Sequence, residues 1–394
     1  MGPSVLAGDS RPPAAVPRPP GASCGAARIA PPPGLCFDAA MSISRPSIKT
    51  FVLPEGGIFD RSVPIHRTPG GTEFVRTPDE RFAGLSGYPF APHWVEIDGL
   101  RVHYVQEGPA DGPLVVLVHG QPTWSYLYRK MIPILAAAGL RVIAWDNVGF
   151  GRSDKPIDPK VHTYARHVGW YHAILNALAL RDVTLFCQDW GGVIGLRVVG
   201  DSPERFARVC AANTGLVVAP DGSGMTLPET VRMGTDPRRF GEAAMADLPT
   251  RKGFTATFQW WIDYTLASSD FRAGDMVHVH TRGSLTPEEQ AGYDAPYPSY
   301  IYAIAPHVFP AMVPTIIDDN VAAWESLGRF ERPFLFLGGN LDPLGSVAVQ
   351  TRHTDHIPGA RGRSHDRYDA GHFIQEEIGE EMAGRLLRFV REDR

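Results

Sequence analysis

Cysteine is scarce in this chain, with four residues among 394. Cys24 and Cys36 fall in a stretch rich in proline and alanine, whereas Cys187 and Cys210 fall inside runs that have the pattern of buried strands. Because this distribution offers no paired framework, it argues against structural disulfides and favours a reducing compartment. We therefore expect a cytoplasmic protein.

Long hydrophobic runs and clusters of basic residues are also lacking. The longest apolar run, "LVVLVHG", has the length of a strand and falls well short of the roughly 18 residues that a membrane helix needs. Basic residues are scattered singly in a chain of net charge -5, so no positive stripe is available for nucleic acid phosphates. These absences predict a soluble globular protein whose partners include neither a membrane nor a nucleic acid.

The composition divides the chain into an extension and a folded part. Residues 1–40 are rich in proline, alanine, glycine and arginine and cannot bury enough apolar surface to fold. We expect residues 1–72 to form a largely disordered extension. The folded part is predicted to consist of a first core segment (73–214), a helical cap (215–315) and a second core segment (316–394).

Short apolar runs alternate with helix-period segments on both sides of the predicted cap. "HWVEID" and "RVHYVQEG" alternate as half-buried strands, "LVVLVHG", "RVIAWD", "VTLFCQD", "FARVCAAN" and "PFLFLGG" are continuously apolar, and "RYDAGH" follows near the end. "TWSYLYRKMIPILAAAG" and "TYARHVGWYHAILNALAL" have helical spacing, and the cap is rich in aromatic residues, methionine and proline. The pattern predicts an α/β fold, with a mostly parallel eight-stranded sheet, helices on both faces and an inserted helical cap.

Three ionisable residues directly follow predicted strands. Asp189 ends a strand in "LFCQDWGG", Asp342 lies in "NLDPLG", and His372 lies in "AGHF". An open parallel sheet binds ligands beyond the carboxyl ends of its strands, and the order nucleophile, acid, histidine is that of α/β-hydrolase triads. Each residue alone has a structural explanation, as a helix N-cap, a turn residue or a core histidine, but these explanations do not predict three strand ends in that order.

An aspartate at the strand-to-helix turn changes the chemistry that a serine would give. An aspartate carboxyl group ordinarily has a pKa of about 3.9, so it is ionised at neutral pH and can attack a saturated carbon without a base. The product is an ester of Asp189, which His372 would hydrolyse by activating water while Asp342 fixes the imidazole tautomer. An unperturbed histidine pKa of roughly 6.5 predicts that this hydrolysis fades below that pH.

The leaving group is either a halide or an epoxide oxygen, and the side chains that face it decide between the two. A halide needs N–H donors, which the Gln121 amide and the Trp190 indole can supply, and the cap doublet Trp260 and Trp261 offers a second indole. An epoxide needs hydroxyl groups that protonate the opening ring. The cap tyrosines that could serve are Tyr264, Tyr293, Tyr297, Tyr300 and Tyr302.

Several motifs in combination resemble the haloalkane dehalogenases of the α/β-hydrolase superfamily, from about Phe74 to the C-terminus. They are "HGQPTWSYLYRKMIP", "WDNVGFGRSDKP", "VTLFCQDWGG", "AGYDAPYP" and "AGHFIQEE". The acid after the seventh strand, in "NLDP", resembles the first subfamily of these enzymes. The resemblance implies that Asp189 is the nucleophile, His372 the base and Asp342 its acid partner.

The resemblance also implies a halide site and an oxyanion hole. Trp190 and a cap tryptophan would bind the halide, and the distance to "SSDFR" favours Trp261 over Trp260. The backbone N–H groups of Gln121 and Trp190 would form the oxyanion hole. Members of the subfamily commonly have glutamate where this chain has Gln121, so the side chain here gains a donor. The implied partners are a halogenated alkane and water, and we expect a monomer.

Two other functions stay open on the sequence. An epoxide hydrolase shares the aspartate, the histidine and the "DWGG" turn, but usually has an aromatic residue after "HG". A non-catalytic binding protein of the same fold usually lacks a triad member, and this chain retains all three. The histidine pairs in "HTDH" and "HVH" lack a third ligand and "GFGRSD" lacks the context of a nucleotide loop, so we expect neither a metal nor a cofactor.

Overall fold

The computed structural model describes residues 62–218, 261–262, 265–266, 271–342, 344 and 347–392. All of them belong to one compact unit, residues 45–394. Within these ranges, none of the helices combines the length and the apolar character that crossing a membrane requires. Cys187 and Cys210 are buried free thiols, whereas Cys24, Cys36 and Trp260 lie outside the described residues.

An eight-stranded sheet forms the centre of the described structure. Its strands, in spatial order, are β11 (Asp366–Tyr368), β10 (Phe334–Gly339), β9 (Phe206–Ala212), β8 (Val183–Gln188), β5 (Leu114–Val118), β6 (Arg141–Trp145), β4 (Leu100–Glu107) and β3 (His93–Ile97). Neighbouring strands are parallel except in the β3–β4 and β4–β6 pairs, which are antiparallel. The predicted eight-stranded, mostly parallel sheet is confirmed.

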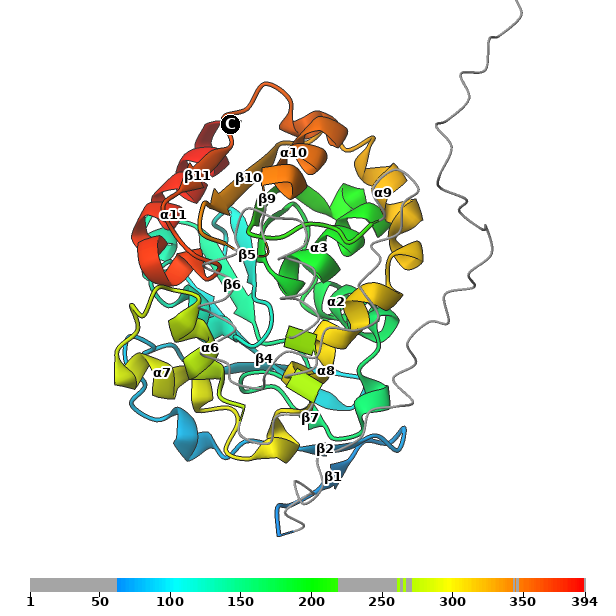
Figure 1. Ribbon diagram of the computed structural model, residues 1–394, viewed down its shortest axis with the longest axis vertical. Coiled ribbons are helices and arrows are strands. Elements are labelled where there is room, and N and C mark those ends of the chain that lie inside the picture. Colours follow the sequence, from blue (N-terminus) through cyan, green and yellow to red (C-terminus); the bar gives the residue numbers. More distant parts are fainter. Residues whose placement is uncertain are drawn as a thin grey trace, which may run out of the picture. The chain divides into compact units, whose positions relative to one another are not determined.

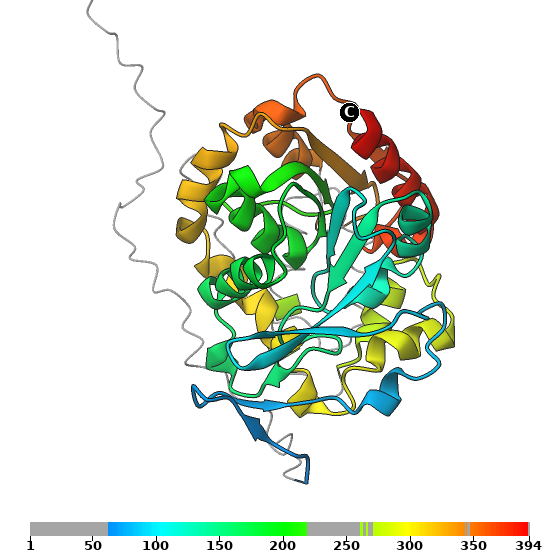
Figure 2. The same ribbon diagram turned by 180° about the vertical axis from the view of Figure 1, so that it is seen from behind.

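Helices lie on both faces of this sheet (Figure 1, and from behind in Figure 2). They are α1 (Ile132–Ala137), α2 (Tyr164–Ala177), α3 (Trp190–Asp201), α6 (Ala273–Val279), α7 (Pro287–Asp294), α8 (Ile304–Met312), α9 (Val321–Leu327), α10 (Val347–His356) and α11 (Ile374–Glu392). The long helix predicted over 123–139 is wrong, because this segment forms a short 3-10 helix, Ser125–Tyr128, followed by α1. Pro133 explains the break, since proline lacks an N–H and is accommodated only in the first turn of a helix.

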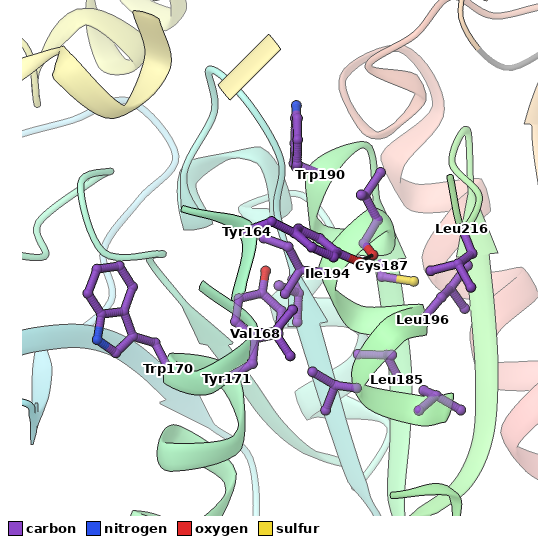
Figure 3. Close-up of a cluster of buried hydrophobic side chains, with 14 of the residues drawn as sticks. Tyr164, Val168, Trp170, Tyr171, Leu185, Cys187, Trp190, Ile194, Leu196 and Leu216 are labelled. Carbon is purple, nitrogen blue, oxygen red and sulfur yellow. Dashed lines mark hydrogen bonds between the residues drawn. The ribbon is translucent and has the colours of Figure 1, made fainter. Parts of the chain in front are cut away.

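The two faces of the sheet bury separate hydrophobic cores. Because side chains alternate along a strand, Val116 and Val118 of β5 belong to the core covered by α2 and α3. Val115 and Leu117 belong to the core covered by α1 and α11. Figure 3 shows part of the first core, with side chains from α2, β8 and α3 packed together. Burial on both faces explains why this strand is continuously apolar in the sequence.

The first two strands of the described chain form a small second sheet with a later strand. It consists of β1 (His66–Arg67), β2 (Glu73–Val75) and β7 (Lys155–Pro156), in the order β1-β2-β7. The last part of the predicted extension, residues 62–72, therefore includes a paired strand, whereas residues 1–61 lie outside the described residues.

Helices α6, α7 and α8 lie between β9 and β10 in the chain, within the predicted cap. Helices α6 and α7 pack against each other (Figure 1). The side chain of Arg129, buried in the core segment, donates to Glu289 of α7 at 2.6 Å and to Glu376 of α11 at 2.9 Å. The hydroxyl of Tyr293 in α7 also donates to Glu376. This network of hydrogen bonds connects α7 to Arg129 and to α11. Residues 219–260 of the predicted cap lie outside the described residues.

Candidate active site

Asp189 occupies a strained turn between β8 and α3. Its backbone has φ 51° and ψ -129°, a conformation that costs energy for a residue with a side chain and is found where surrounding packing enforces it. The glycines that follow permit that packing. A Cβ added to Gly191 would lie 2.2 Å from the carbonyl oxygen of Val118, and one added to Gly192 would lie 2.2 Å from Thr214. The expected sharp turn is present, with the carboxylate at its tip.

The three ionisable residues that the sequence places after strands lie together. Nε2 of His372 is 3.4 Å from Oδ2 of Asp189, and Nδ1 of His372 is 2.9 Å from Oδ1 of Asp342. The imidazole and both carboxylates are largely withdrawn from solvent. Because Asp342 accepts at Nδ1, it holds the imidazole in the tautomer that leaves Nε2 toward Asp189.

Hydrogen bonds to the backbone fix the loop that carries His372. Its N–H donates to the carbonyl of His280, at the end of α6, at 3.1 Å. Asn213 donates from Nδ2 to the carbonyls of Gly371 and His372, each at 2.9 Å. Gln188, the last residue of β8, donates from Nε2 to the same His372 carbonyl at 3.2 Å. Strand ends and the cap therefore both position the histidine.

The two carboxylates change the titration of His372. Burial alone would lower its pKa, but the charges of Asp342 and Asp189 and the hydrogen bonds to them raise it to about 10. In the free protein the two carboxylates therefore favour the imidazolium, whereas the expectation for the ester-hydrolysis step, in which Asp189 is no longer charged, stays a prediction. Nearby His280 behaves in the opposite way, because burial lowers its pKa to about 4 and leaves it neutral.

The segment after β5 supplies an N–H donor to the Asp189 carboxylate. The backbone N–H of Gln121 donates to Oδ1 of Asp189 at 2.7 Å. A Cβ added to Gly120 would lie 2.2 Å from the same Oδ1 and 2.6 Å from the backbone nitrogen of Trp190, so only glycine permits this approach. The side-chain amide of Gln121 donates from Nε2 to the carbonyl of Pro306 in α8 at 2.9 Å. One of its two N–H groups is thus engaged with the cap.

A cavity lies against Asp189 between the core and the cap. It is lined by Gln121, Pro122, Asp189, Trp190, Trp261, Met276, His280, Leu344, His372 and Phe373. Trp190 and Trp261 reach it from the turn and from the cap, and the indole nitrogen of Trp190 points away from the packed side chains of α2 and β8 (Figure 3). The halide-binding role expected for Trp261 stays a prediction, and its neighbour Trp260 is outside the described residues.

The cap tyrosines do not line this cavity in the described part of the chain. Tyr293 donates its hydroxyl to Glu376, and Tyr297 donates to the carbonyl of Pro122 at 3.3 Å. The ring of Tyr300 packs at a tilt of 32° against His307, with ring centroids 4.3 Å apart. Tyrosine hydroxyls that could protonate an epoxide oxygen are therefore not seen at Asp189, although Tyr264 is outside the described residues.

Metal ligation finds no support in the described residues. No group of three or more histidine, cysteine, aspartate or glutamate side chains is arranged there to hold a metal ion. The two histidine pairs have other contacts. His353 accepts the N–H of Leu216 at 2.8 Å, and the ring of His356 stacks on Trp324 at 3.8 Å. His280 faces the cavity instead.

Three residues contribute to the site without a clear signal in the sequence. Gln188 is part of the "LFCQDWGG" stretch but carried no signal beyond its place before Asp189. His280 stood out in the sequence only as one of the two histidines of "HVH", a pair that lacks a third metal ligand. Pro306, the partner of the Gln121 amide, lies in the cap, and a contact over 185 positions leaves no trace in local periodicity.

Comparisons with known proteins show the family of the chain. A profile of the alpha/beta hydrolase fold matches residues 113–377. A haloalkane dehalogenase of Mycobacterium marinum is 44% identical over 326 residues, which cover 80% of this chain and 99% of that protein. The chain belongs to the haloalkane dehalogenase family. Its membership confirms the predicted fold and the predicted enzyme class, a hydrolase acting on carbon–halide bonds.

Further haloalkane dehalogenases show the same extent of similarity. Haloalkane dehalogenase 1 of Mycobacterium tuberculosis (strain CDC 1551 / Oshkosh) is 45% identical over 325 residues, covering 80% of this chain and 98% of that one. The solved tetrameric structure of haloalkane dehalogenase DpaA from Paraglaciecola agarilytica NO2 superposes with a TM-score of 0.67 at 29% identity. The superposition covers 80% of this chain and 98% of the DpaA chain.

Proposed function

We propose that this enzyme hydrolyses haloalkanes through a covalent ester on Asp189. The observation that carries the proposal is the orientation of the carboxylate, because Oδ1 accepts the Gln121 N–H while Oδ2 lies beside His372. Oδ2 is therefore the oxygen available for attack. A new C–O bond forms between Oδ2 and the substrate carbon, the carbon–halogen bond breaks, and the halide leaves with the electron pair.

Hydrolysis of the ester uses the other two residues. His372 takes a proton from water at Nε2, and the resulting hydroxide attacks Cγ of Asp189. The developing negative charge falls on Oδ1, which the Gln121 N–H already contacts at 2.7 Å, with the nearby backbone nitrogen of Trp190 as a second donor. Asp342 stabilises the imidazolium formed at this stage. Cleavage of the bond from Cγ to Oδ2 releases the alkoxide, which takes the proton of the hydroxyl group added to Cγ and becomes the alcohol, leaving Asp189 ionised. His372 then returns its proton to solvent, so the products are the alcohol, the halide and one proton.

The two cavity indoles suit a halide leaving group. An indole N–H donates but cannot accept, so it stabilises an anion without offering a proton for transfer at neutral pH. Trp190 and Trp261 both line the cavity that contains Asp189. Together with the placement of the described cap tyrosines elsewhere, this favours a halide over an epoxide oxygen as the group displaced.

Halide release from 1-bromobutane and 1,2-dibromoethane by the purified protein tests the activity, with styrene oxide consumption followed in parallel. Wild-type protein should release bromide, and Asp189→Ala should release none. Diol from styrene oxide without bromide would reassign the enzyme as an epoxide hydrolase. The ester itself is tested with His372→Phe, which should accumulate an alkylated peptide containing Asp189 in mass spectra. An unmodified peptide after exposure to a reactive bromide would contradict the mechanism.

We also propose a cytoplasmic monomer that works with a halogenated alkane and water as its partners. The buried free thiols of Cys187 and Cys210 support a reducing compartment. The DpaA relative is described as tetrameric, so the assembly state needs its own measurement. Light scattering on the full chain should give the mass of a single chain, and a mass four times larger would replace the monomer with a tetramer.

A further inference from the structure

Gln188 makes two contacts with His372, one to its backbone and one to its ring. The side chain is fully buried at the end of β8. Its Nε2 lies 3.2 Å from the carbonyl oxygen of His372 and 3.1 Å from Nε2 of the imidazole. Its Oε1 is buried and has no hydrogen-bond partner in the described part of the structure.

The backbone contact fixes which end of the amide faces the histidine. An amide turned the other way would place its oxygen against the carbonyl oxygen of His372, and two acceptors repel each other. With Nε2 in place, one N–H of Gln188 donates to the carbonyl and the second faces the imidazole nitrogen. A donor in that place interacts favourably with a lone pair on Nε2 and unfavourably with a proton there.

We propose that Gln188 is a positioning residue that holds His372 in the neutral, Nδ1-protonated form while the Asp189 ester is hydrolysed. The inference rests on the proposed function, because it concerns the step after the ester has formed. It adds to that function a way to keep His372 deprotonated at Nε2, although the neighbouring carboxylate of Asp342 favours the imidazolium.

The charges around His372 make such a means necessary. In the free protein the ring faces Asp189 at Nε2 and Asp342 at Nδ1, and both carboxylates favour the imidazolium. The ring of His280 lies 6.4 Å away and is neutral, because burial lowers its pKa to about 4. Beyond Asp342 lies the guanidinium of Arg367, which interacts with that carboxylate. Once Asp189 is an ester its charge is gone, and the Gln188 N–H remains to oppose Asp342.

The pH dependence of ester hydrolysis tests the proposal. Substrate is mixed with enzyme at a series of pH values, the reaction is stopped in acid, and the alkylated Asp189 peptide is followed by mass spectrometry. Hydrolysis needs neutral His372, so its rate rises with pH around the pKa of the histidine in the ester form. Gln188→Met removes the donor and should move the midpoint upward by about 0.5 to 1 pH unit. Gln188→Glu adds an acceptor and should move it further upward.

Gln375 offers a matched control. It is also a fully buried glutamine, and both polar atoms of its side chain lack partners in the described structure. Gln375→Met should leave the midpoint at its wild-type value. Equal midpoints in wild type, Gln188→Met and Gln188→Glu, with a rate lowered to the same extent at every pH, would overturn the proposal and leave Gln188 a packing residue. A His372→Phe enzyme that forms no ester would instead overturn the proposed function, so the two failures are distinct.

Discussion

Oδ2 of Asp189 lies 3.4 Å from Nε2 of His372. In the free enzyme this contact helps to raise the pKa of the histidine to about 10, together with the second carboxylate on its other side. In the proposed mechanism, formation of an ester neutralises Asp189 and removes its part of that stabilisation. The imidazole therefore becomes easier to deprotonate at the stage when a neutral base is required.

The first prediction concerns that change in charge. Asp189→Asn is nearly isosteric and neutral, as the proposed ester is, so the pKa of His372 should fall below the value of about 10 in the wild-type protein. The measurement is an NMR titration of the histidine ring signals, with His372→Phe assigning the resonance. An unchanged pKa in Asp189→Asn would show that Asp342 alone determines the titration.

Much of this site follows from local rules in the sequence. Asp189, Asp342 and His372 each stand where a parallel strand ends, and such ends meet at one edge of a sheet. Strand periodicity placed them correctly, because burial of β8 and β10 on both faces leaves long apolar runs. The membership of the chain in the dehalogenase family confirms the fold, and the catalytic roles of the three residues stay predictions.

The properties that the sequence did not give depend on contacts between distant segments. The pKa of His372 depends on two carboxylates 183 and 30 positions away, and their joint effect requires distances and burial. The Gln121 side chain was expected to face the halide, but one of its N–H groups is engaged by Pro306 across the cap interface. Pro133 is the exception, because it lies within the segment itself and limits α1 to the residues from Ile132 onward.

The second prediction concerns the cap indole. Trp261→Phe keeps an aromatic ring in the cavity but removes an N–H donor, and a hydrogen bond to a charged group contributes about 1.5–3 kcal/mol. The dissociation constant for bromide, measured by quenching of tryptophan fluorescence, should therefore rise about tenfold or more. Trp324→Phe, on α9 and stacked against His356, is the control and should bind bromide as the wild type does. Equal affinity in both variants would move the second halide donor elsewhere, with Trp260 as the next candidate.

The third prediction concerns the close approach at Gly120. Gly120→Ala would force a methyl group to within 2.2 Å of Oδ1 of Asp189, so the carboxylate must shift. A displacement of this size should lower kcat/KM for halide release by about 100-fold or more. Gly169→Ala is the control, because this exposed helical glycine has no atom within 4 Å of an added Cβ. It should keep full activity and raise the free energy of unfolding by about 0.5–1 kcal/mol. Full activity in Gly120→Ala would show that the reaction tolerates movement of the Asp189 carboxylate.

The contact between Gln121 and Pro306 has a local cause within α8. Pro310 lies inside this helix and has no N–H to donate to the carbonyl four residues earlier, which is that of Pro306. The Gln121 amide donates to this carbonyl at 2.9 Å from the core side of the cavity. A glutamine rather than an acceptor-only glutamate is thus matched to a proline in the facing cap helix.

The fourth prediction follows from this pairing. Gln121→Met leaves the buried Pro306 carbonyl without its donor and should lower the free energy of unfolding by about 1–3 kcal/mol in urea titrations. In a Pro310→Ala background the helix can supply its own N–H to Pro306, so the same substitution should cost less. A double-mutant cycle should therefore give a coupling of about 0.5 kcal/mol or more between positions that share only this carbonyl. Strictly additive effects would show that the helix does not use the restored donor and that the amide contributes to the cap by another contact.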